Sequence, residues 1–131
     1  MIGLDTNILV RLLVNDDQKQ SNQIVKRLEE AERNGEKIFI SKLVLIETMW
    51  VLNSVYGFKP DKIVNALEIV SQIPSVKFED SDLFDKLVDG YSDCKAGLAD
   101  QLIRLDDLKS GCDIILSFDK KLCRLEKVDK P

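Results

Sequence analysis

The sequence contains no histidine, and its three cysteines, Cys94, Cys112 and Cys123, form no CxxC pair. Structural zinc sites take most of their ligands from these two residue types, and activated serine or cysteine nucleophiles usually depend on a histidine base. The composition therefore argues against both kinds of site. An odd set of separated cysteines fits reduced thiols, from which we expect a cytoplasmic protein.

Long apolar runs are also absent. No segment approaches the roughly 20 residues that a membrane-spanning helix needs, and the N-terminus lacks the basic region and cleavage site of a secretory signal. Repeats and low-complexity tracts are missing too. A length of 131 residues with 44% hydrophobic side chains is typical of one core, so we expect a single domain over residues 1–131 that makes no membrane contact.

The chain has no excess of basic residues. It carries 19 Lys and Arg against 23 Asp and Glu, for a formal net charge of −4. This argues against a protein held on nucleic acid by its bulk charge. An enzyme that acts on nucleic acid is still compatible with it, because a carboxylate cluster that holds a divalent cation lowers the formal charge, and the bound ion then inverts the local field.

Short apolar segments alternate with helical patterns along the chain, which predicts an α/β fold with a parallel sheet and right-handed crossovers. Residues 114–116 have the pattern of a buried strand, and residues 76–78 that of an exposed one. Further strands are expected at 2–4, 38–40 and Val128, and helices at about 7–14, 18–34, 42–56, 61–73, 81–93 and 97–109. We expect a helix-rich three-layer α/β/α sandwich with four or five short strands.

Four acids occupy distinctive places in this pattern. Asp5 and Asp119 each follow an apolar strand, Glu47 interrupts an almost wholly apolar helix, and Asp100 lies in the first turn of another helix. Two of them also have an ordinary explanation, since Glu47 can emerge at a helix edge and the helix dipole favours an acid at the position of Asp100. The carboxyl ends of parallel strands meet at one edge of a sheet, which predicts that the four acids converge there.

Carboxylates brought together in this way repel one another by roughly 4 kcal/mol per pair at 4 Å and an effective dielectric of about 20. A bound cation removes this cost, and a set of oxygen ligands without His or Cys suits Mg²⁺ or Mn²⁺. Such a site can activate a water molecule and clamp a phosphodiester.

Neighbouring polar side chains could support the site. Three of them are placed to orient the acids by hydrogen bonds: Thr6, Asn7 and Ser117. Three cations could contact substrate phosphates, although solvated surface charges explain them equally well: Arg11, Arg104 and Lys120.

The segments around the four acids resemble those of PIN-domain nucleases, and among these the short VapC-type toxins agree best in length and motif order. The resemblance covers nearly the whole chain, and its specificity comes from four weak motifs in the right order. These are Leu4-Asp5-Thr6-Asn7, Ile46-Glu47-Thr48, Leu98-Ala99-Asp100-Gln101-Leu102-Ile103 and Leu116-Ser117-Phe118-Asp119-Lys120.

The resemblance implies a metal-dependent endoribonuclease, the toxin of a toxin–antitoxin pair. It implies Mg²⁺ or Mn²⁺ as cofactor, with the acidic quartet as ligands and catalytic residues: Asp5, Glu47, Asp100 and Asp119. It further implies a parallel sheet of strand order 3-2-1-4-5, an RNA substrate, a homodimer, and inhibition by a cognate antitoxin that covers the acidic groove.

The third motif departs from the family pattern. Many relatives carry Asp-Phe where this chain has Gly97-Leu98, so one supplementary acid is missing. Asp93 or Asp113 could replace it if the fold brings either of them close. The departure leaves open whether one ion or two bind.

One further enzyme class and two non-enzymatic classes are the alternatives. A phosphatase of the haloacid dehalogenase type needs a second acid two residues after the first, and that position is Asn7 here. A receiver domain needs paired acids after the first strand and a phosphoacceptor after the third, and neither is present. A decayed PIN-like domain that only binds a partner is the remaining alternative.

Overall fold

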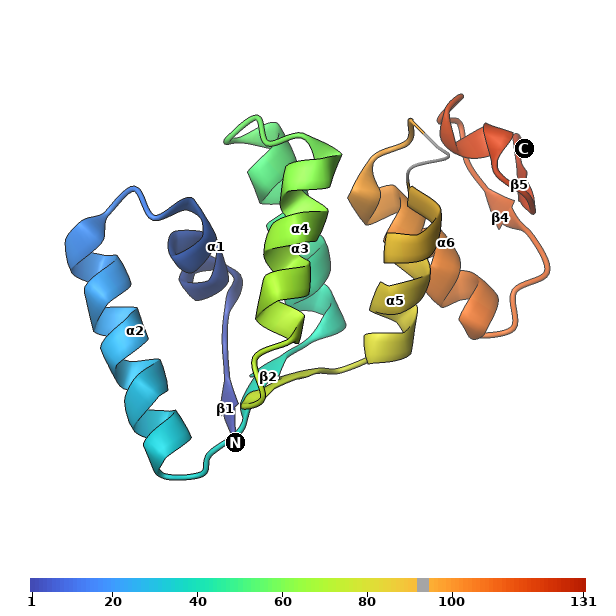
Figure 1. Cartoon of the computed structure of the whole chain (residues 1–131). Helices are drawn as coiled ribbons and strands as arrows, with labels where there is room; N and C mark the ends of the chain where they lie inside the picture. The colour runs from blue at the N-terminus through green and yellow to red at the C-terminus, as the bar shows by residue number, and fades with distance from the viewer. Residues whose placement is uncertain (92–94) are drawn as a thin grey trace. The chain divides into compact units, whose positions relative to one another are not determined.

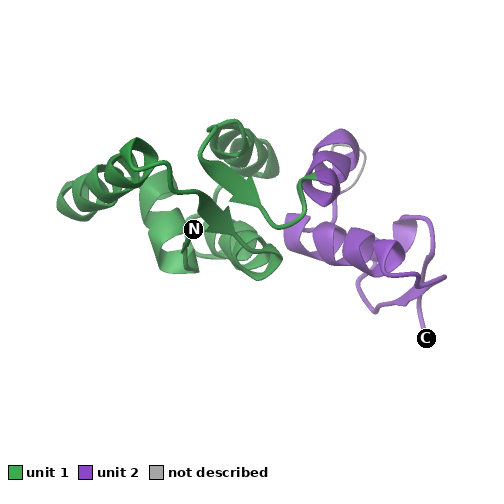
Figure 2. Cartoon of the chain, turned by 90° about the horizontal axis from the view of Figure 1, so that it is seen from below, with its two compact units in different colours: residues 1–81 green, residues 82–131 purple. Residues whose placement is uncertain are grey.

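The computed structural model describes residues 1–91 and 95–131, so Asp93, Cys94 and the expected end of the helix at 81–93 lie outside the described residues. The chain divides into two compact units, Met1–Ser81 and Asp82–Pro131 (Figure 2). The single domain over residues 1–131 stays a prediction. Within the described ranges, no helix is long and apolar enough to cross a membrane.

Unit 1 is built on a parallel sheet of three short strands in the order β1-β2-β3; Figure 1 labels β1 and β2 of this sheet. Ile38 in β2 aligns with Ile2 in β1 and with Val76 in β3. The strands are β1 (Ile2–Gly3), β2 (Ile38–Ile40) and β3 (Val76–Phe78), and the helices are α1 (Thr6–Val14), α2 (Gln18–Arg33), α3 (Lys42–Ser54) and α4 (Pro60–Ser71).

The described residues of unit 2 form two α-helices and a parallel pair of strands, with β4 beside β5. Its elements are α5 (Ser81–Gly90), α6 (Leu98–Lys109), β4 (Ile115–Leu116), a 3-10 turn η2 (Leu122–Arg124) and β5 (Val128–Asp129). A helix-rich α/β fold with parallel strands is thus confirmed. The observed pairs match the 3-2-1 and 4-5 parts of the expected order, and the neighbourhood of the first and fourth strands stays a prediction.

Helix starts follow the capping chemistry of the sequence. The side chains of Asp5, Asp17 and Ser41 each accept a hydrogen bond from the backbone N–H three residues later, at 3.0, 3.0 and 3.2 Å. These residues are therefore the N-caps of α1, α2 and α3. Pro60 begins α4, where its missing N–H costs nothing.

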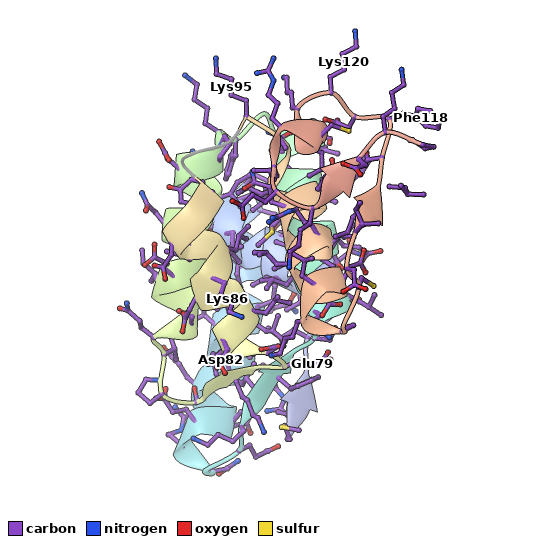
Figure 3. All side chains as sticks on the ribbon, turned by 90° about the vertical axis from the view of Figure 1, so that its right-hand side faces the viewer. Glu79, Asp82, Lys86, Lys95, Phe118 and Lys120 are labelled. Carbon is purple, nitrogen blue, oxygen red and sulfur yellow. The ribbon has the colours of Figure 1, made fainter. Side chains whose placement is uncertain are left out.

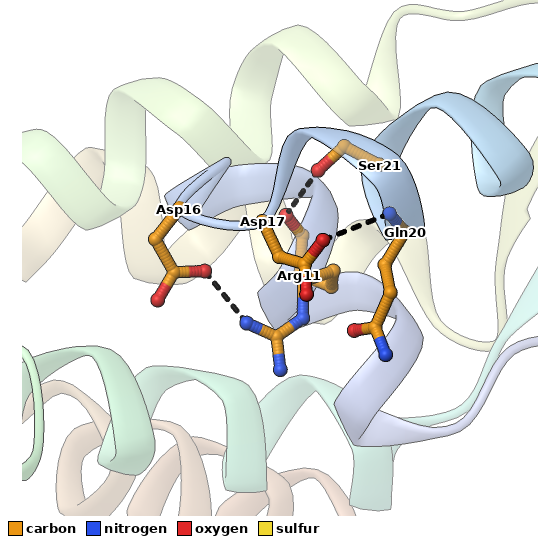
Figure 4. A network of polar contacts seen from close by, with 5 residues as sticks. All are labelled: Arg11, Asp16, Asp17, Gln20 and Ser21. Carbon is orange, nitrogen blue, oxygen red and sulfur yellow. Dashed lines mark hydrogen bonds and ion pairs between the residues drawn. The ribbon is translucent and has the colours of Figure 1, made fainter.

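The turn between α1 and α2 is held by polar contacts (Figure 4). Asn15 ends α1 in the left-handed conformation, with φ of 54°. Arg11 pairs with Asp16 at 2.6 Å, and this hydrogen bond raises the pKa of the Arg11 guanidinium. Ser21 donates to the Arg11 carbonyl at 3.4 Å. Together these bonds fix the start of α2 against the end of α1.

The hydrophobic core of unit 1 lies between its helices and the sheet. Leu9 of α1, Leu52 of α3 and Leu67 of α4 are completely buried. In unit 2, a smaller cluster of Ala96, Leu122 and Val128 underlies the β4–β5 pair. Apolar periodicity in the sequence correctly marked the buried sides of α4 and α5.

Three expectations about exposure were wrong. β3 was expected to be exposed. It lies at the sheet edge, but its Phe78 side chain is buried, with 7% of its surface exposed. β4 was expected to be buried, yet Ile114 and Leu116 are 49% and 62% exposed, since unit 2 by itself covers only one side of its two-stranded sheet. The apolar pattern of residues 18–34 predicts that Val25 lies on the buried side of the helix with Ile24, Leu28 and Ala31, yet Val25 is 43% exposed.

Thr48 carries the one buried side-chain oxygen or nitrogen that has no hydrogen-bond partner among the described residues. Its side chain is completely buried in α3. A buried hydroxyl without a partner costs about 1–3 kcal/mol. Thr48→Val should therefore raise the free energy of unfolding by about 1 kcal/mol, measured by urea denaturation.

The control is Ser21→Ala, because the Ser21 hydroxyl is also buried but makes its hydrogen bond. This variant should lose about 0.5–1.5 kcal/mol. A lower stability of Thr48→Val would contradict the assignment of an unsatisfied hydroxyl.

Candidate active site

Asp5 lies at the carboxyl end of β1, as the sequence predicted. The segment is tied to β2 by the bond from the Leu4 N–H to the Phe39 carbonyl, at 3.0 Å. Oδ1 of Asp5 accepts the Ile8 N–H at 3.0 Å and so caps α1. The residue is exposed. The cap fixes the orientation of the carboxylate while Oδ2 keeps no hydrogen-bond partner within the described part of the chain.

Glu47 is connected to the first motif by a hydrogen bond that spans 41 residues. The Thr6 hydroxyl donates to Glu47 Oε2, and α1 packs against α3. Glu47 lies on the exposed side of α3 together with Leu43, which explains how the helix tolerates a carboxylate within an apolar sequence. This contact supports the expected role of Thr6 as a hydrogen-bond donor to one of the acids.

Asp100 lies in the first turn of α6 and is exposed. The N-cap, Gly97, offers no side-chain hydrogen bond, and a Cβ added there would lie 3.5 Å from Asp100 Oδ2. The loop before α6 is held by Gln101, whose buried amide donates to the Ala96 carbonyl at 2.7 Å. Sequence reasoning missed this contact, although a glutamine in the first turn of a helix beside the apolar Leu98 and Leu102 is a signal for it.

Asp119 follows β4 and is held in a tight turn. Its Oδ1 accepts the N–H groups of Lys121 and Leu122 at 2.9 and 2.8 Å. Its own N–H donates to the Ser117 hydroxyl at 3.0 Å. Ser117 therefore shapes the turn through the Asp119 backbone rather than through its carboxylate.

The four acids are divided between the units, with Asp5 and Glu47 in unit 1 and Asp100 and Asp119 in unit 2. Among the residues described, no group of three or more Asp, Glu, Cys or His side chains could hold a metal ion. The convergence of all four acids therefore stays a prediction, as does a supporting role for the exposed Asn7.

Neither residue suggested as a replacement for the missing acid is shown in that role. Asp93 lies outside the described residues. Asp113 is exposed in the segment before β4, and among the described residues it forms no metal-binding group with Asp100 and Asp119.

Two of the three candidate phosphate contacts have partners within the chain. Arg11 pairs with Asp16, and the Arg104 guanidinium donates twice to the Glu126 carbonyl, at 3.0 and 2.7 Å. These bonds favour structural roles for both arginines. Lys120 is exposed next to Asp119 in the sequence and remains a candidate phosphate contact.

The sequence matches the PIN domain family over residues 2–128, and the chain belongs to this family. It is similar to the VapC ribonuclease of Aquifex aeolicus, with 25% identity over 122 residues that cover 93% of this chain and 90% of that protein. A solved structure, Mycobacterium tuberculosis VapC20, described as a sarcin-ricin loop cleaving toxin, aligns over the whole of both chains with 22% identity and a TM-score of 0.43.

Proposed function

We propose that this PIN-domain chain is a metal-dependent endoribonuclease of the cytoplasm and the toxin of a toxin–antitoxin pair. Its similarity to the VapC ribonuclease of Aquifex aeolicus, which extends over nine-tenths of both proteins, carries the proposal. The matched region, residues 2–128, includes all four acids. RNA, a cognate antitoxin and a second copy of the chain are the proposed partners.

The donor set suits a hard divalent cation. Every candidate ligand is a carboxylate oxygen, and the chain offers no histidine that would favour zinc. Asp5, Glu47, Asp100 and Asp119 would hold Mg²⁺ or Mn²⁺. When bound, the ion would supply charge stabilisation at the phosphodiester and a water molecule activated for attack.

The local contacts of this chain hold several of these carboxylates in defined orientations. The Ile8 N–H fixes one oxygen of Asp5, and the Thr6 hydroxyl holds Oε2 of Glu47. Two N–H groups hold Oδ1 of Asp119. Ligands oriented before substrate arrives need little reorganisation during the reaction, which is the main way a protein contributes to phosphodiester hydrolysis.

Cleavage of RNA by the purified chain tests the proposal. Structured RNA incubated with the protein and Mg²⁺ or Mn²⁺ should yield discrete internal cuts on a denaturing gel, whereas a mock purification from cells without the gene should yield none. No cleavage in either metal would instead favour the decayed PIN-like domain that binds a partner without hydrolysing RNA.

A further inference from the structure

Phe118 is the most exposed phenylalanine of the chain. Its side chain is 76% exposed, whereas Phe78 and Phe84 are buried and the other two are half-buried. Burying an aromatic ring is among the largest gains that a side chain makes in folding. The packing of unit 2 therefore does not account for the position of this ring.

The ring is presented by a well-held turn directly beside a candidate catalytic acid. Phe118 lies between Ser117 and Asp119, whose N–H donates to the Ser117 hydroxyl at 3.0 Å. The thiol of Cys123 contacts the Ser117 carbonyl at 3.3 Å. With the backbone fixed on both sides, the exposed aromatic side chain is held one residue before Asp119.

The turn that carries the ring is rich in cations, although the whole chain is acidic. Residues 117–124 contain three cations and one carboxylate, in a chain of net charge −4. Figure 3 shows Phe118, Lys120 and Lys95 at the same end of unit 2, with their side chains pointing outward. Both of these lysines are exposed. An aromatic face flanked by cations complements a strand that carries bases and phosphates in alternation.

We propose that Phe118 stacks on an unpaired base of the RNA next to the phosphodiester that Asp119 engages, while Lys120 contacts a neighbouring phosphate. This inference rests on the proposed ribonuclease function and specifies its substrate as an unpaired loop or single strand. Bases within a duplex are stacked on one another and offer no free face to an aromatic side chain. Stacking itself accepts any base, so Phe118 selects for unpaired structure rather than for sequence.

Binding to a labelled single-stranded RNA, measured by fluorescence anisotropy in Mg²⁺, tests the stacking contact. The assay uses the full chain carrying Asp5→Asn, so that the RNA is not cut. Adding Phe118→Ala should weaken binding about 5- to 150-fold, the range observed when a stacking ring is removed. Phe118→Leu, which keeps apolar bulk without an aromatic face, should also weaken it, whereas Phe118→Tyr should retain affinity within about threefold.

The matched control is Ile69→Ala, since Ile69 is 68% exposed on α4 of unit 1 and is similarly apolar. It should leave RNA binding unchanged. Binding of a fully paired duplex should be weak in the parent and insensitive to Phe118→Ala.

The lysine contact has its own signature in the salt dependence. Each phosphate contact to a single strand adds about 0.7 to the slope of log K against log salt. Lys120→Gln should lower the slope by about this amount, whereas Phe118→Ala should lower affinity at unchanged slope. Lys86→Gln, which removes an exposed lysine from α5, is the charge-matched control and should not change the slope.

If the unsubstituted chain cleaves RNA while Phe118→Ala in the Asp5→Asn chain binds RNA and melts like the Asp5→Asn chain alone, the stacking role is overturned and the ribonuclease function stands. If the unsubstituted chain cleaves no RNA, the proposed function is what fails. The inference would also be overturned if Phe118→Ala lowered the melting temperature and Phe118→Tyr lost RNA binding as well. The ring would then stabilise the fold through contacts within the protein.

Discussion

Asp119→Asn should reduce the rate of RNA cleavage roughly 1,000-fold or more while leaving the protein folded. A bound metal contributes several kcal/mol of charge stabilisation in the transition state, and each 1.4 kcal/mol is about a factor of ten in rate. Removing a ligand charge forfeits much of this contribution. Single-turnover cleavage of labelled RNA measures the effect, and Asp5→Asn should behave alike.

Asparagine is the informative replacement because both acids also have local structural roles. Oδ1 of Asp5 caps α1, and Oδ1 of Asp119 accepts two N–H groups of the following turn. An amide oxygen can take over these bonds, and asparagine is as good an N-cap as aspartate. The melting temperatures should therefore stay close to that of the parent.

Asp17→Asn supplies the matched control. Asp17 caps α2 through the Gln20 N–H in the same way that Asp5 caps α1, but it is not one of the four acids. Its replacement should leave cleavage unchanged. Equal loss of cleavage in Asp17→Asn and Asp5→Asn would show that capping, and not metal ligation, explains the effect.

Removal of divalent metal should abolish cleavage altogether. Without a cation, the carboxylates repel the substrate phosphates as well as one another, so both binding and reaction are opposed. EDTA should reduce cleavage to background, and an excess of Mg²⁺ or Mn²⁺ over the chelator should restore it. Robust cleavage by clean protein in EDTA would refute the metal-dependent mechanism.

The melting temperature offers a second readout of metal binding, independent of activity. A ligand that binds only the folded protein stabilises it by mass action. Mg²⁺ should therefore raise the melting temperature of the parent, and this shift should shrink in Asp119→Asn and Asp5→Asn but persist in Asp17→Asn. An equal shift in all four proteins would show that the cation binds somewhere other than at Asp5 and Asp119.

Local chemistry explains why much of the secondary structure could be predicted. Ser41 and Asp17 begin helices because their side chains satisfy the first free N–H groups. Gly35 follows a helix end with φ of 72°, a conformation that side chains with a Cβ rarely adopt. The placement of Asp5 and Asp119 directly after short strands was likewise evident from the order of apolar and acidic residues.

The sequence by itself determined the helices, the short parallel strands, the membership of the PIN domain family and the identity of the four candidate acids. Only the tertiary structure revealed the hydrogen bond from Thr6 to Glu47 and the exposed ring of Phe118. It also revealed that Arg11 pairs with Asp16 and that Arg104 donates to the Glu126 carbonyl. The physical reason is the range of the interactions. Caps and turns depend on residues three or four positions apart, whereas contacts over tens of residues and the exposure of a strand depend on which elements cover one another in space.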